Sequence, residues 1–170
     1  LSRCVARLTI RSDDAVTPPK GSVNKVMVDD KGLLVLCALG LPPMRHGDDP
    51  FRAVRAAMDI PAAIAMVKGD AQVRVGVSTG RAFCGVVGHS ELRREYSVMG
   101  PCVNLCARLM MSAAQGSVMV CKESRKAASD AGIEFGDPIV LHLKGIGDRE
   151  GYVFFFQPVD HISFTEFSRS

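Results

Sequence analysis

The stretch 73–111 constrains the fold of this chain more than any other part. Valines at 73, 75 and 77 alternate with other residues, which predicts a β-strand that ends at Gly80. The strand pattern resumes over 83–87, and 96–99 predicts a third short strand. Gly100-Pro101 then predicts the end of that strand and the start of a helix, because proline fits the first helical turn without losing a hydrogen bond.

Two polar side chains share one face of this predicted helix. Asn104 and Arg108 are four residues apart, so they lie about one turn from each other. An arginine presents a planar fork of donors to phosphate oxygens, and a neighbouring amide suits a sugar hydroxyl. An isolated pair with this spacing is explained more simply by a solvated helix face, so the pair alone assigns no function.

The rest of the chain predicts an α+β fold. Pro61 lies inside a helical pattern at 51–67 and predicts a kink or a break there, whereas 1–10 fits either a helix end or a short strand. Strands joined by hairpins and by helices predict a mostly antiparallel sheet with helices packed on one face. The other predicted elements are a hairpin of strands 26–28 and 33–39, a strand at 118–121, a helix at 123–131, strands at 139–143 and 152–156, and a tail at 161–170.

Composition narrows the class of protein. The chain has 170 residues, 47% of them hydrophobic, which is enough for one core and one domain. A net charge of +3 with scattered basic residues argues against nucleic-acid binding, and no apolar run is long enough to cross a bilayer. The six cysteines lie in apolar segments without a C-x-x-C pair, and the four histidines form no ligand cluster. We therefore expect buried free thiols and a cytoplasmic location.

Three strings in the central stretch carry a resemblance to a known family. FCGVVGH at 83–89, EYSVMG at 95–100 and VNLCARLM at 103–110 resemble the catalytic core of class III nucleotidyl cyclases. The chain looks most like the second catalytic half of the bicarbonate-responsive soluble adenylyl cyclases. Further matching strings are NKVM at 24–27, AAMDI at 56–60 and LKGI at 143–146.

The resemblance covers about 23–156 and implies a ferredoxin-like cyclase homology domain. We therefore expect one catalytic domain over 1–160, followed by the tail. The chain begins at Leu1, and only 24 residues precede Lys25, which is too short for the opening strand and helices of the family. The resemblance thus implies an N-terminally incomplete domain whose opening strand is missing.

The resemblance also implies a site made of separate parts of the chain. Lys25 matches the lysine that contacts adenine, where guanine-selective relatives carry a glutamate. Ser97 matches a residue that faces the adenine amino group, and Val98 would offer its backbone beside the base. Asn104 matches the residue that orients the ribose, and Arg108 matches the arginine that stabilises charge on the transferring phosphate.

The metal site departs from the family pattern. Family members use Mg²⁺ or Mn²⁺ held by two aspartates, but Asp13 and Asp14 lie in a proline-rich loop and are poor substitutes. Asp29 lies near the register of a metal ligand, although a turn explains it better. Lys144 matches a family position too, in a segment interpreted as a structural turn. We therefore predict no metal ligand in this chain and expect the metal to be held mainly by a partner domain.

These observations favour an adenylyl cyclase half-domain in intracellular signalling. It would form cyclic AMP from ATP at an interface with a first-half cyclase domain, from the same parent chain or another. The alternative is a non-catalytic regulatory half that binds only nucleotide or its partner. A guanylyl cyclase is disfavoured by Lys25, and an RNA-binding domain of similar topology is disfavoured because the central strands lack paired aromatics.

Overall fold

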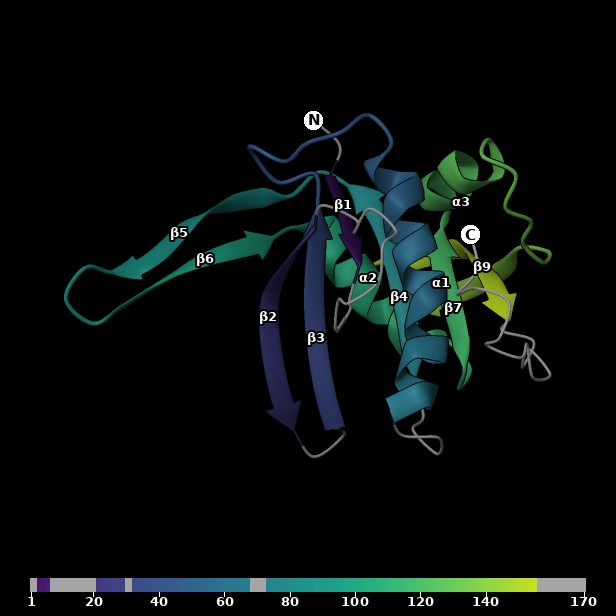
Figure 1. Cartoon of the computed structure of the whole chain (residues 1–170), viewed down its shortest axis with the longest axis horizontal. Helices are drawn as coiled ribbons and strands as arrows, with labels where there is room; N and C mark the ends of the chain where they lie inside the picture. The colour runs from purple at the N-terminus through teal and green to yellow at the C-terminus, as the bar shows by residue number, and fades with distance from the viewer. Residues whose placement is uncertain (1–2, 7–20, 30–31, 68–72, 156–170) are drawn as a thin grey trace, which may run out of the picture.

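The computed structural model describes residues 3–6, 21–29, 32–67 and 73–155 (Figure 1). A seven-stranded sheet with the order β2-β3-β1-β4-β7-β9-β8 forms its centre. β4 and β7 run parallel, and the other neighbouring pairs that the structure describes are antiparallel, which confirms the predicted α+β class. The strands are β1 (Arg3–Ala6), β2 (Gly21–Asp29), β3 (Gly32–Leu39), β4 (Arg74–Gly80), β7 (Ser117–Cys121), β8 (Ile139–Leu143) and β9 (Gly147–Phe155).

The first strand corrects one prediction. β1 lies near the middle of the sheet and pairs antiparallel with both β3 and β4. The expectation that the opening strand is missing is therefore wrong. Its pattern could not be distinguished from a helix end, because the pairing that makes it a strand comes from residues more than 30 positions away. Asp13 and Asp14 lie outside the described residues.

The helices cover both faces of the sheet, not one face as predicted. Along β7, Val118 and Val120 point into a core that includes α1 and α3, whereas Met119 and Cys121 pack with Leu109 of α2 on the opposite side. Alternating side chains of a strand point to opposite faces, so a strand that is buried along its whole length, as β7 is, needs cover on both. The helices are α1 (Asp49–Val67), α2 (Pro101–Ser112) and α3 (Lys122–Ser129).

The helix α1 runs without a break through Pro61. Ile60 is buried in the core before the proline, and Ile64 packs against the same core after it. Burial on both sides of Pro61 holds the two parts in one helix, although proline removes one backbone hydrogen bond. The predicted break at Pro61 is therefore absent.

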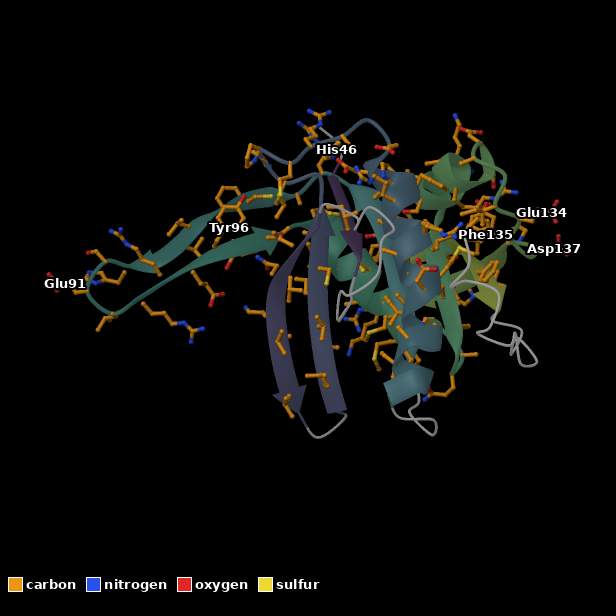
Figure 2. All side chains as sticks on the ribbon, viewed as in Figure 1. His46, Glu91, Tyr96, Glu134, Phe135 and Asp137 are labelled. Atoms are coloured by element: carbon orange, nitrogen blue, oxygen red, sulfur yellow. The ribbon has the colours of Figure 1, made fainter. Side chains whose placement is uncertain are left out.

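The two strands of the central motif leave the main sheet. β5 (Phe83–His89) and β6 (Arg93–Met99) form a separate antiparallel ribbon that extends away from the body of the molecule (Figure 1). Figure 2 shows Glu91 at the tip of this ribbon and Tyr96 along it. The sequence predicted both strands but not their separation from the sheet.

The described cysteines are packing residues, as predicted. Cys37, Cys102, Cys106 and Cys121 are buried and Cys84 is partly buried, and none of these five forms a disulfide. Desolvation raises the pKa of both Cys102 and Cys121. These thiols therefore stay neutral at pH 7 and pack as small apolar groups.

The helix α2 lies directly on the backbone of β4. A Cβ atom added at Gly76 would lie 2.4 Å from the carbonyl oxygen of Cys106. The Ser78 hydroxyl donates a hydrogen bond of 2.6 Å to the carbonyl oxygen of Cys102, and the Cys106 thiol donates one of 3.1 Å to that of Gly76. This close packing against β4 fixes the position of α2, which begins at Pro101 as predicted.

Replacing Gly76 by alanine is expected to destabilise the fold by about 3 kcal/mol, because the new methyl group meets backbone that cannot rotate away. The urea midpoint of unfolding measures the change. Gly47→Ala is the matched control, since a Cβ atom there meets nothing within 4 Å. Equal midpoints for the two variants would contradict this packing.

Candidate active site

A β-bulge in β2 joins that strand to the ribbon. The pairing of β2 with β3 shifts register between Val23 and Lys25, which places Asn24 at the irregularity. The Asn24 side-chain amide donates a hydrogen bond of 2.8 Å to the carbonyl oxygen of Tyr96. Bulges re-aim side chains, and this one ties β2 to β6 where Lys25 and Ser97 meet.

Lys25 and Ser97 are held by one carboxylate. Lys25 Nζ lies 3.1 Å from Glu95 Oε1, and the Ser97 hydroxyl donates a hydrogen bond of 3.0 Å to the same oxygen. Arg93 Nη2 contacts the other oxygen, Glu95 Oε2, at 3.0 Å. The hydrogen bond from Lys25, followed by the one from Ser97, lowers the pKa of Glu95 from its ordinary value. We name Lys25, Glu95 and Ser97 the base cluster.

The base cluster places a donor beside a hydroxyl oxygen. The Lys25 side chain is 43% exposed, and its ammonium carries three N–H donors, so two remain beyond the contact with Glu95. Ser97 is only 8% exposed, at the base of the ribbon. The side chain of Val98 is buried in an apolar cluster with Cys102 and Cys106, so any contact from Val98 to a ligand would come from its backbone.

A second group of predicted residues lies on α2. Asn104 and Arg108 are both exposed and line one pocket of about 380 Å³, as their spacing on a helix predicted. The opposite wall is the turn between β8 and β9, which contributes Lys144, Gly145 and Ile146. Leu109, on another side of the helix, is fully buried. We name Asn104, Arg108 and Lys144 the phosphate cluster.

Lys144 was not among the predicted site residues, although its LKGI string matched the family. The turn interpretation is correct, since Gly145 has φ +79° and the chain reverses there from β8 into β9. That same turn brings the lysine to the pocket of Arg108. Within the described part of the chain, neither Arg108 nor Lys144 has an ion-pair partner, so the pocket holds two uncompensated positive charges that suit an anion.

A small pocket lies between the elements that carry Lys25 and Arg108. A smaller apolar pocket of about 130 Å³ lies between the β2–β3 hairpin and α2. One wall includes Met27, two residues after Lys25 on β2, and another includes Ala107, which also lines the pocket of Arg108. The strand with Lys25 and the helix with Arg108 therefore border the same hollow.

The described side chains include no metal centre with three ligands from this chain. Over 3–6, 21–29, 32–67 and 73–155, no three side chains of histidine, cysteine, aspartate or glutamate come together. The backbone of Asp29 ends β2 opposite Gly32, but its side chain is outside the description. No step of the chemistry is therefore assigned here to a metal ligand of this chain.

Comparison with known families decides the assignment. Residues 26–156 match the family described as the adenylate and guanylate cyclase catalytic domain. The chain belongs to this cyclase family. The resemblance to class III cyclases, drawn from the strings around Asn104 and Arg108, is confirmed.

The relatives of this cyclase domain include both nucleotide specificities. It is 44% identical over 92 residues to adenylate cyclase type 10 of Homo sapiens and 41% identical to that of Rattus norvegicus, covering 54% of this chain. It spans 6% of the length of each of these relatives. Its fold matches the guanylyl cyclase Cya2 (TM-score 0.70, 20% identity, 94% of both chains) and the adenylyl cyclase CyaB from P. aeruginosa (TM-score 0.67, 21% identity, 81% of this chain and 74% of the other). Among the described helices, none has the length and apolar character to span a membrane.

Proposed function

We propose that this chain is an adenylyl cyclase half-domain that forms cyclic AMP and pyrophosphate from ATP. It would act with a first-half cyclase domain in intracellular signalling, in the cytoplasm. The proposal is supported by the base cluster, which includes Lys25 of β2, and by the pocket beside Arg108 of α2, because β2 and α2 border one apolar hollow. The curated relatives are named adenylate cyclases, which supports the same nucleotide.

In this proposal the base cluster binds adenine. A free N–H of Lys25 donates to the acceptor N1, and the oxygen of Ser97 accepts from the neighbouring amino group. The backbone of Val98 lines the base. Guanine presents the opposite pattern on this edge, an oxygen beside an N–H, and an ammonium has no lone pair with which to accept from that N–H.

The phosphate cluster orients the reacting groups. Asn104 holds the ribose so that its 3′-hydroxyl attacks the α-phosphorus and gives up its proton to water, while the bond from that phosphorus to the bridging oxygen breaks and pyrophosphate leaves. Arg108 donates to the oxygens that gain charge, and Lys144 neutralises the leaving polyphosphate. Such phosphoryl chemistry depends mainly on positioning and on charge stabilisation.

A partner domain would complete the site. Bound Mg²⁺ or Mn²⁺ supplies charge neutralisation in this chemistry, and we propose that its ligands come mainly from the first-half domain. Exposed apolar side chains on both hairpins support such pairing, since contiguous apolar surface marks interaction sites. They are Val23, Val26, Met27, Val28 and Leu33 on β2–β3, and Phe83, Val86, Tyr96 and Met99 on the ribbon.

A second candidate is a regulatory half that binds nucleotide or partner without turnover. A guanylyl cyclase is the third candidate, since Cya2 has this fold and that activity in its name. Lys25 argues against a guanylyl cyclase, because its ammonium cannot accept the hydrogen bond that the N–H on this edge of guanine donates.

Mixing this chain with a metal-bearing first-half cyclase domain in Mg²⁺ or Mn²⁺ tests the proposal. We expect cyclic AMP from ATP and little cyclic GMP from GTP, with neither half active alone. A mixture that binds ATP without turnover would support the regulatory half. Turnover of GTP in preference to ATP would overturn the adenine assignment.

A further inference from the structure

Glu95 touches both members of the proposed adenine-reading pair, and it accepts from Ser97 rather than donating to it. A carboxylate whose pKa is lowered is ionised at pH 7 and has no proton to give. The hydroxyl proton of Ser97 must therefore point at Glu95 Oε1, 3.0 Å away. A lone hydroxyl could turn that proton in any direction, but this one is held.

We propose that Glu95 is a specificity-determining residue that makes Ser97 an obligate acceptor toward the base. This inference rests on the proposed function and adds to it the origin of the preference for a 6-amino purine. With its proton occupied, Ser97 presents only lone pairs, which match an amino group and repel a 6-oxo group. Glu95 acts through Ser97 and does not itself touch the base, so it is a positioning residue.

The surroundings of Glu95 hold it in this role. Lys25 shares Oε1 with Ser97, which keeps the carboxylate charged and turned toward the base cluster. Arg93 binds Oε2, on the side away from Ser97, and its own side chain is 82% exposed. Ser97 and Arg93 therefore contact different oxygens of the carboxylate, so each contact can be removed by a separate substitution.

ATP and inosine triphosphate test the proposal directly, because they share ribose and phosphates. They differ at position 6, amino against oxo, and in the proton on N1. Affinities are measured by calorimetry on the chain paired with a first-half cyclase domain. We expect the wild-type pair to favour ATP by at least tenfold. Glu95→Ala frees the hydroxyl to donate to the 6-oxo group, so inosine triphosphate should bind about fivefold more tightly relative to ATP.

Arg93→Ala is the matched control, since it removes a contact to the same carboxylate without freeing Ser97, and the ratio of affinities should stay within about twofold of wild type. The same comparison is then made in protein that already carries Ser97→Ala. There Glu95→Ala should no longer change the ratio of affinities, because the hydroxyl through which Glu95 acts is gone. A merely structural role of Glu95 would weaken both nucleotides alike and leave the ratio unchanged.

The possible failures are distinguishable. Equal affinities of the wild-type pair for both nucleotides would overturn the adenine assignment itself, and the inference with it. A wild-type preference for ATP that survives Glu95→Ala would overturn only the inference. A Glu95 effect that persists in the Ser97→Ala background would also overturn it, because the carboxylate would then act through Lys25. Circular dichroism of each variant checks that the ribbon mutations leave the fold intact.

Discussion

Replacing Arg108 by alanine should lower the rate of cyclic AMP formation by the paired halves by about a hundredfold or more. Arg108 is exposed, lines the pocket with Asn104 and Lys144, and has no ion-pair partner among the described residues. Its guanidinium is therefore free to donate to phosphate oxygens as charge develops. The affinity for ATP should also fall, but the loss in kcat should be larger, because the contact to the phosphates exists in the bound state and strengthens in the transition state.

Arg55→Ala is the control for this change. Arg55 is an exposed helix arginine on α1 whose ion pair with Asp59 has an N···O distance of 3.9 Å. It should leave turnover unchanged and should alter stability by less than about 0.5 kcal/mol. Full turnover by the Arg108→Ala pair, with the thermal midpoint preserved, would mean that Arg108 only solvates the helix.

Replacing Lys25 by glutamate should weaken ATP binding by about tenfold to a hundredfold. The change removes the donor to adenine N1 and brings a second carboxylate beside Glu95, which now lies 3.1 Å from the lysine nitrogen. Two neighbouring carboxylates repel, and the cluster can then accept from guanine N1–H. Competition binding with ATP and GTP measures the change, and the preference for ATP should fall.

Arg93→Glu makes the same change of charge next to the same carboxylate. Because Arg93 is on the side of Glu95 away from Ser97, its replacement should weaken ATP binding by only about twofold. Equal losses from Lys25→Glu and Arg93→Glu would show that the charge of the region matters and that Lys25 has no specific contact with the base.

The elements with strong local signals were predictable. Alternating valines marked β4, and Gly100-Pro101 marked the start of α2. What the chain could not reveal depends on distant pairing. β1 is a strand because β3 and β4 bind it on both sides, and β5 and β6 leave the sheet because they pair with each other. The two-sided cover by α1 and α2 follows from β7, which is buried along its whole length.

The site was predictable to a similar extent. The spacing of Asn104 and Arg108 and the matching of Lys25 and Ser97 to family positions identified side chains that the fold brings together in two clusters. Glu95 was overlooked because a carboxylate has no evident role beside a base until its two hydrogen-bond partners are known. Lys144 was set aside because its segment was interpreted as a structural turn, and only the position of the β8–β9 turn brings it to Arg108.

We propose that one nucleotide spans both clusters. The most direct measurement is calorimetry of the paired halves with adenosine, tripolyphosphate and ATP, for wild type, Lys25→Glu and Arg108→Ala. We expect adenosine to lose affinity only with the lysine variant, tripolyphosphate only with the arginine variant, and ATP with both. Tripolyphosphate affinity that falls equally with Lys25→Glu and with Arg108→Ala would contradict a nucleotide that spans both clusters. ATP affinity that is unchanged by either substitution would contradict it too.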